Sequence, residues 1–374
     1  MTLAELRRFA VARAFHPPTD LLSAIRKLGY LQADPIRAPA RAQDLILRHR
    51  VAGYRIDDLE NHYPRLPIIE DVLHNYGFFP EEHLALLYPR TLSSRWRDFI
   101  DEHRPLRRKL RRYLGEQEEA HPREVERVLG AGARVNGWGG TSSATTLMLE
   151  ALHREGFARV CRRDKGMRVY SLAPPRAVAL SPIARADGLI GLIIDLYAPL
   201  PQRSLMRVIG MMGAYKPDVD FCKRIDLLVK RGKYQRVTVD GLAYLWPAHE
   251  VAPETVEDEV RFLAPFDPVV WDRTRFEHLW GWAYRFEAYT PPAKRKLGYY
   301  ALPLLWREHV IGWANTSVVT GQLKVQIGYA SKQLLRGNTA GFNTSLESET
   351  ERYRRFLPGS PQAAPSGQPA VSRS

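Results

Sequence analysis

Apolar residues recur at helical spacing in two segments at the start of the chain. The first segment covers residues 2–14 and stops at the His16-Pro17-Pro18 run, and the second covers residues 20–28 and stops at Gly29. Spacing of three to four residues predicts amphipathic helices, and glycine is a common residue just past a helix end. Residues 30–34 then favour a short extended segment, and a third helix is expected after Pro39.

Two later stretches repeat this order of helices followed by a strand pair. In residues 121–173 a helix that ends at Gly156 precedes two strand-like runs separated by residues 164–166. In residues 186–246 helical segments precede two strand-like runs that turn at residues 240–241. A helix followed directly by a two-stranded wing is typical of a winged helix-turn-helix unit. We therefore expect three such units in series, related by a structural repeat.

The last third of the chain has a different pattern. Residues 260–330 contain short strand-like runs with frequent glycine and proline, which favour a small β-barrel or a curved sheet. From Pro358 onward the chain is rich in proline, serine, glycine and alanine, which is typical of disorder. The expected fold class is α+β, with three tandem winged helix-turn-helix units followed by a small C-terminal β-barrel.

The same patterns place the expected domain boundaries. In chain order the expected parts are a first winged-helix unit with a basic helix, a second and a third unit, the barrel-like domain, and a tail that is disordered at its end. Their expected limits are residues 1–115, 116–176, 177–250, 251–346 and 347–374.

The formal net charge of +14 favours a polyanionic partner, and nucleic acid is the first candidate. An anionic membrane surface is the rival. No apolar run approaches the roughly 20 residues of a membrane span, and the N-terminus lacks the pattern of a signal peptide. Cys161 and Cys222 lie in different segments without CxxC spacing. We therefore expect a reducing cytoplasm, no disulfide framework and no zinc site.

The candidate chemistry lies in Gln32-Ala33-Asp34. In an extended backbone, residues i and i+2 project from the same face, so the side chains of Gln32 and Asp34 are expected to point together. An amide that orients a water beside a carboxylate that takes its proton is a minimal hydrolytic device. The structural alternative is that both are strand-end residues, with Asp34 capping a turn before Pro35.

Basic residues supply candidate DNA contacts. Arginines follow the Gln-x-Asp pair, crowd a helical stretch at residues 92–114 with a break expected at Pro105, and recur on the wing of the second unit. The candidates are Arg37, Arg41, His74, Arg107, Arg108, Arg111, Arg162, Arg163, Lys165 and Arg168. Each candidate has a structural alternative. Arg37 and Arg41 could pair with Asp44 or Glu60, and the basic run could be a solvated helix face. The wing could point away from DNA, and His74 could be a buried core histidine. The aromatic cluster at 271–300 is expected to be mostly barrel core, without a catalytic role.

Taken together, the chain resembles the bacterial tandem winged-helix DNA glycosylases of the AlkZ/YcaQ-like family, which unhook interstrand crosslinks and remove alkylated bases. The resemblance runs over about residues 1–335. It rests on the segments at residues 28–50, 74–80, 157–172 and 261–303. It implies three winged-helix units and a β-barrel that form a curved DNA channel. It also implies a Gln-x-Asp catalytic element, here Gln32 and Asp34.

One segment departs from the pattern of that family. Many members carry Trp-Ala-His-Glu-Ala-Ser where this chain has Val-Leu-His-Asn-Tyr-Gly at residues 72–77. The histidine, His74, is retained, but the acid is replaced by Asn75. The lesion specificity is therefore left open by the resemblance.

The expected function is a monofunctional DNA glycosylase that hydrolyses the N-glycosidic bond of alkylated purines or unhooks interstrand crosslinks. Asp34 would activate the water and Gln32 would orient it. The alternative is a non-catalytic winged-helix DNA-binding protein, either a transcription regulator or a repair scaffold. Double-stranded DNA is the expected partner of a monomer without cofactor, metal or membrane association, located in the bacterial cytoplasm at the nucleoid.

Overall fold

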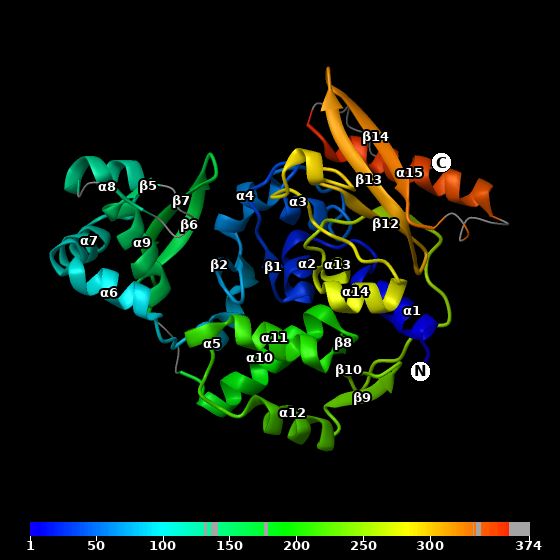
Figure 1. The fold of residues 1–374 in the computed structure, drawn as a ribbon. Helices are drawn as coiled ribbons and strands as arrows, with labels where there is room; N and C mark the ends of the chain where they lie inside the picture. Colours follow the sequence, from blue (N-terminus) through cyan, green and yellow to red (C-terminus); the bar gives the residue numbers. More distant parts are fainter. Residues whose placement is uncertain (131–132, 136–140, 176–178, 332, 334–337, 359–374) are drawn as a thin grey trace, which may run out of the picture.

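A computed structural model describes the whole chain except residues 131–132, 136–140, 176–178, 332, 334–337 and 359–374. Helices and strands are mixed along the chain, as Figure 1 shows, which agrees with the expected α+β class. No helix among the described residues is long and apolar enough to span a membrane.

The N-terminal part combines short helices with a three-stranded antiparallel sheet of order β1-β3-β2. Its elements are α1 (Leu3–Ala14), α2 (Leu21–Leu28), β1 (Leu31–Gln32), α3 (Ala42–Leu47), α4 (Asp58–His62), η1 (Tyr63–Arg65), β2 (Ile68–Val72) and β3 (Tyr76–Pro80). The first two helices end where the sequence predicts and begin one residue later, because Thr2 and Asp20 are their N-caps; Gly29, at φ 68°, ends α2. The hairpin of β2 and β3 has no counterpart in the prediction. It brings residues 73–75 against β1.

The next part is built around a pair of helices, α6 and α7, of which α7 is strongly basic. Its elements are η2 (Glu81–His83), α5 (Leu84–Leu87), α6 (Ser94–Glu102), α7 (Arg104–Glu116), α8 (Pro122–Leu129), β4 (Ala133–Val135), β5 (Thr141–Ser143), α9 (Ala144–Glu155), β6 (Ala158–Asp164) and β7 (Met167–Leu172). The break between α6 and α7 falls at His103, and Pro105 lies in the first turn of α7, where its missing N–H costs no helical bond. Leu106, Leu110 and Leu114 of α7 enter a core that is separate from the main one.

The third part repeats the order of helices and sheet seen in the first. It contains α10 (Pro182–Tyr197), β8 (Leu200–Pro201), α11 (Gln202–Met211), η3 (Gly213–Tyr215), α12 (Phe221–Lys230), β9 (Tyr234–Val239) and β10 (Leu242–Pro247), with sheet order β8-β10-β9. Leu189 and Ile193 of α10 share one buried cluster with Leu6 of α1 and Ile25 of α2. The first and third parts therefore form a single core.

The C-terminal part is an open sheet backed by a long helix. It contains β11 (Val260–Phe262), α13 (Pro268–Trp271), α14 (Arg273–Trp280), η4 (Pro292–Lys294), β12 (Leu302–Trp306), β13 (His309–Val319), β14 (Gln322–Tyr329) and α15 (Thr339–Phe356). The strand order is β11-β12-β13-β14, and no pairing of β14 with β11 closes a barrel in the described residues. Helix α15 runs across residue 346, the expected end of this domain, and residues 359–374 of the expected tail lie outside the described part.

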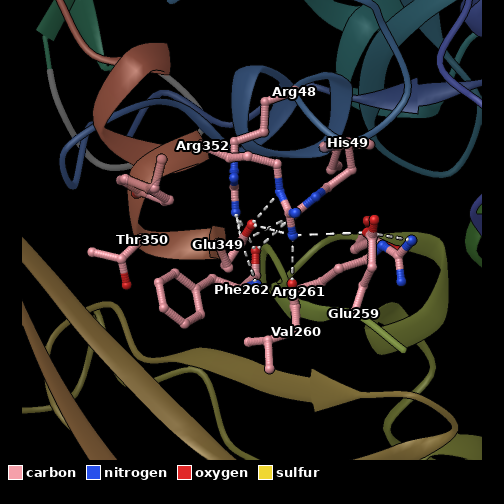
Figure 2. A network of polar contacts seen from close by, with 12 residues as sticks. Arg48, His49, Glu259, Val260, Arg261, Phe262, Glu349, Thr350 and Arg352 are labelled. Atoms are coloured by element: carbon pink, nitrogen blue, oxygen red, sulfur yellow. Dashed lines mark hydrogen bonds and ion pairs between the residues drawn. The ribbon is translucent and has the colours of Figure 1, made fainter. Parts of the chain in front are cut away.

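A buried polar network joins α15 to the N-terminal part (Figure 2). The carboxylate of Glu349, which is fully buried, accepts hydrogen bonds from Arg48 just after α3, from the Phe262 backbone N–H at 2.8 Å and from Arg352 Nε at 3.2 Å. His49 Nε2 donates to the Phe262 carbonyl at 3.0 Å, and complete burial holds the pKa of His49 well below its usual value. One carboxylate thus ties together α3, β11 and α15.

Candidate active site

Gln32 lies at the end of β1, with its amide held from two sides. Its Oε1 accepts hydrogen bonds from the indole Nε1 of Trp271 at 2.9 Å and from Asn75 Nδ2 at 3.3 Å. Asn75 belongs to the turn between β2 and β3, and Trp271 ends α13. The side chain of Gln32 is therefore fixed by two segments that are distant in sequence.

Gly77 explains how the β2–β3 hairpin can lie so close to β1. It pairs with Gln32 in the antiparallel ladder. A Cβ at this position would lie 2.4 Å from the Leu31 carbonyl oxygen and 2.4 Å from the ring of Tyr30. Only glycine allows this approach without moving the backbone. The glycine at residue 77 therefore lets β3 pack closely on β1 beside Gln32.

Asp34 is 7% exposed and uses only part of its hydrogen-bonding capacity. Its Oδ1 accepts from the Ile36 backbone N–H at 2.9 Å, and its own N–H donates to Gln43 Oε1 at 3.1 Å. No hydrogen bond joins Oδ2 to another described residue. Burial raises the pKa of Asp34 above its usual value, and the bond from Ile36 opposes this shift. The carboxylate thus forms the turn that the structural alternative predicts and still keeps one oxygen for chemistry.

Two tyrosines of the loop at residues 281–300 lie within the electrostatic reach of Asp34. Burial raises the pKa of Tyr300 well above its usual value, and the charge of Asp34 raises it further. Its hydroxyl is buried and has no hydrogen-bond partner among the described residues. Partial burial and then the charge of Asp34 raise the pKa of Tyr289, whose side chain is 78% exposed. The charge of Asp34 therefore acts on one buried and one exposed phenol of this loop.

The loop that carries these tyrosines is held in shape by Glu287. Its Oε2 accepts backbone N–H bonds from Lys296 and Leu297, both at 2.8 Å. Phe286 packs edge-on against Tyr300 and Tyr289, with ring centroids 5.1 and 6.1 Å away. These hydrogen bonds and ring contacts fix the conformation of the loop.

His74 lies behind the Gln32–Trp271 contact. Its ring meets Trp271 edge-on with centroids 4.7 Å apart, and its Nε2 is 3.5 Å from the hydroxyl of Tyr197. Burial, with a smaller effect from the charge of Arg207, lowers the pKa of His74 to about 3. A histidine in this state is neutral at physiological pH, and here it packs against the tryptophan.

The sequence can now be compared with known proteins. It matches the family model for AlkZ-like DNA glycosylases over residues 25–356, which includes every site element described above. The chain belongs to this family. The match confirms the resemblance drawn from the sequence and assigns DNA glycosylase activity and DNA binding at the level of the AlkZ-like family. No group of His, Cys, Asp and Glu side chains in the described residues of this AlkZ-like chain is arranged to hold a metal ion.

The basic candidates nearest the AlkZ-like site are engaged in ion pairs. Arg37 pairs with Asp57 at 2.6 Å, and Arg41 pairs with Glu60, one of the two partners considered for it. The turn of the β6–β7 wing touches this region, because a Cβ on Gly166 would lie 2.9 Å from Arg41 Nη2. The wing therefore packs on the part that carries Gln32 and Asp34.

The candidates on the wing differ in their surroundings. Arg163 makes a bidentate pair with the buried Glu70 at 2.7 and 2.9 Å, and Arg168 lies 3.6 Å from the centre of the Tyr76 ring. Arg162 pairs with the surface residue Glu119 at 2.7 Å, whereas Lys165 is exposed at the turn. Of these four wing candidates, Arg162 and Lys165 are the ones whose side chains reach the surface.

The candidates on α7 lie on its solvent side. Arg108 and Arg111 are exposed, and Arg111 stacks 4.1 Å from the centre of the Phe157 ring. Arg107 is partly buried and pairs with Glu155 at 3.0 Å. This basic face belongs to a different part of the molecule from Gln32, Asp34 and His74, of which Gln32 and His74 both contact Trp271.

Trp271, Tyr289 and Tyr300 are not predicted from the sequence as neighbours of the motif, and Asn75 is noted there only as a departure from the family pattern. The aromatic cluster at 271–300 is predicted to be mostly barrel core: Phe276 and Tyr284 are buried, whereas Trp271 bonds to Gln32 and Tyr289 is exposed. A usable signal was present, because basic residues at 294–296 interrupt the aromatic run, and a core segment rarely carries them.

Proposed function

We propose that this AlkZ-like protein is a monofunctional DNA glycosylase that hydrolyses the N-glycosidic bond of alkylated purines or unhooks interstrand crosslinks. The observation that carries the proposal is Asp34, a largely buried carboxylate with one oxygen bonded to Ile36 N–H and the other without a described partner. The Gln32 amide and the hydroxyl of Tyr300 supply polar groups around it.

Asp34 has the properties that a general base for water requires. As the glycosidic bond breaks, its electron pair leaves with the base and the sugar gains oxocarbenium character. The carboxylate stabilises this cation and takes a proton from the water whose oxygen bonds to C1′. A cationic N7- or N3-alkylpurine becomes neutral as it leaves, so the site needs no strong acid. The raised pKa makes Asp34 a better proton acceptor.

The product is an abasic site with the DNA strand intact. The Gln-x-Asp motif is followed by Pro35 and Ile36 and contains no lysine that could attack C1′ to form a Schiff base. Water is then the nucleophile, and strand cleavage requires a later step by heat, alkali or another enzyme.

The rest of the chain brings DNA to this site. We assign residues 1–115, 116–176 and 177–250 to three tandem winged-helix units, since each contains helices followed by antiparallel strands. Phosphate contacts are assigned to Arg108, Arg111 and Lys165, which are exposed. The arginines with buried or close internal partners, Arg41, Arg163 and Arg168, are assigned to holding the wing against the first unit.

The test is base release from duplex DNA that carries N7-methylguanine or a nitrogen-mustard crosslink, followed by alkali cleavage of the abasic product. We expect wild type to produce cleavable sites and Asp34→Asn to be at least ~100-fold slower, the range for loss of a general base. Asp240→Asn is the matched control, because it makes the same chemical change at an exposed turn of the third part. No product from wild type on either lesion would instead support a non-catalytic DNA-binding protein.

A further inference from the structure

The side-chain amide oxygen of Gln32, Oε1, accepts two hydrogen bonds, one from Trp271 and one from Asn75. We infer that Trp271 and Asn75 are positioning residues that lock the Gln32 amide, so that it presents only N–H donors to the reacting DNA and its water. The inference rests on the proposed glycosylase function and specifies the role of Gln32 within it.

Trp271 determines the orientation of the side-chain amide of Gln32. An indole N–H is a donor with no acceptor capacity. The Gln32 atom that faces it at 2.9 Å must therefore be the carbonyl oxygen, because the alternative orientation would set N–H against N–H. Asn75 adds a second donor to the same oxygen at 3.3 Å.

These two bonds fill the acceptor sites of the Gln32 carbonyl. A carbonyl oxygen has two lone pairs, so Oε1 has none left for a water or a substrate. The amide nitrogen forms no hydrogen bond with a described residue, and it is not among the buried side-chain atoms that lack a partner. The nitrogen is therefore not sealed from solvent by the described residues, and Asp34 follows two residues later, just past the end of β1.

Both locking residues are themselves held firmly. Trp271 stacks on Tyr197 with ring centroids 4.9 Å apart and meets the edge of His74 at 4.7 Å. The backbone carbonyl oxygen of Asn75 accepts from the Leu73 N–H at 3.0 Å and from the Tyr30 hydroxyl at 3.1 Å, which fixes the backbone of this turn. The fixed indole, which can only donate, therefore favours one orientation of the Gln32 amide, and Asn75 Nδ2 adds a second donor to it.

The fixed orientation of the Gln32 amide, called the lock below, gives the two motif residues different roles. The water accepts a hydrogen bond from Gln32 Nε2 and donates one to Asp34, which leaves its second lone pair directed at C1′. When the C–O bond forms, the proton passes to Asp34 and the C–N bonding pair leaves with the base. Gln32 holds the water by donation alone, and Asp34 is the only acceptor of the pair.

A double-mutant cycle on single-turnover base release tests the lock. We expect Gln32→Ala to slow the reaction by at least ~10-fold and Trp271→Phe to slow it several-fold. In the Gln32→Ala background, Trp271→Phe should have no further effect, because its role passes through the amide. DNA affinity should stay within about two-fold in all four proteins, since none of these groups contacts phosphate.

Asn75→Asp provides a second variant that preserves shape and does not depend on the packing of an indole. It sets a carboxylate against the Gln32 oxygen in place of an N–H donor. We expect a slower reaction than wild type, and no effect once Gln32 is alanine. A purely structural role for Asn75 or Trp271 would give the same loss in both backgrounds and would overturn the inference.

Gln32→Glu tests the polarity of the amide directly. Glutamate keeps an acceptor for Trp271 and Asn75 but replaces the outward donor with an acceptor. We expect it to be at least as slow as Gln32→Ala across the pH range in which wild type is active. Activity close to wild type in Gln32→Glu would refute the donor role. If wild type itself releases no base, the proposed function fails; if wild type is active and the cycle is additive, only the lock fails.

Discussion

Asp34 combines a structural and a reactive role in one side chain. Its Oδ1 closes the turn to Ile36, which fixes the carboxylate, while burial raises its pKa. The spacing of Gln32 and Asp34 is a local property, so the sequence predicted the pair. Their partners were not predictable in this way, because Asn75 lies 43 residues from Gln32 and Trp271 lies 239 residues away. Only the folded chain reveals which donors meet the amide.

Asp34→Asn should increase stability at neutral pH while it removes activity. The folded state disfavours the charged carboxylate, so its stability falls as pH rises from the unfolded value of 3.8 through the raised folded pKa. Asparagine avoids that cost and keeps an oxygen for the Ile36 N–H. We expect the melting temperature to rise by roughly 1–3 °C at neutral pH, with no difference below the unfolded pKa. A lower melting temperature at neutral pH would contradict the assigned burial cost.

At the level of elements, helix ends and tight turns were predicted from the sequence because they depend on a few neighbouring residues. The ends of α1 and α2 and the β6–β7 turn at Lys165 and Gly166 follow from caps and left-handed positions, with φ 48° and 83° at the turn. The β2–β3 hairpin was missed because its turn is Leu73-His74-Asn75, without the usual glycine or proline signal. Its glycine, Gly77, lies within β3 and serves the contact with β1 instead.

The two neighbouring arginines on β6 should differ sharply in their effect on stability. Arg163→Gln removes the partner of a buried carboxylate, Glu70, whose pKa burial would raise but the charge of Arg163 holds below its usual value. We expect a loss of about 3 kcal/mol in the free energy of unfolding, measured in urea. Arg162→Gln breaks an exposed pair with Glu119 and should cost at most about 1 kcal/mol.

Equal losses for the two variants would contradict the assigned difference in burial. The Arg163→Met, Glu70→Leu double variant separates charge from packing. Because replacing both members leaves no unpaired buried charge, it should recover most of the stability lost by Arg163→Gln.

At the level of the whole molecule, the charge distribution was easier to predict than the architecture. The basic run became the exposed face of α7, whereas the expected barrel is an open sheet in the described residues. The reason is that strand closure depends on pairing between distant segments, which composition does not encode. Helix α15, which the expected boundary at residue 346 divides between the barrel-like domain and the tail, contributes Glu349 to the core network.

DNA binding should weaken with salt through the contacts on α7. Arg108→Gln and Arg111→Gln should each lower affinity for any DNA sequence and reduce the slope of log K against log salt by about 1. Arg355→Gln on α15 is the control, since α7 and α15 lie at opposite ends of the molecule in Figure 1. An unchanged slope in both α7 variants, measured by fluorescence anisotropy, would remove α7 from the DNA interface.

The network in Figure 2 should determine whether the C-terminal part stays attached. Glu349→Gln removes the charge that neutralises the buried Arg48 and should cost about 3 kcal/mol in the free energy of unfolding. Glu351→Gln makes the same change on the exposed side of α15, where Glu351 pairs with Arg355, and should cost about 0.5 kcal/mol or less. Similar losses in urea denaturation would contradict the role given to Glu349.

The most direct test of the central claim is the single-turnover rate of base release from N7-methylguanine DNA as a function of pH. If Asp34 is the base, the wild-type rate rises with pH through the raised pKa of its carboxyl group and then levels off. Asp34→Asn should be at least ~100-fold slower and show no such rise, while it binds DNA as wild type does. A wild-type rate without an acid limb, or an Asp34→Asn rate equal to wild type, would contradict the account.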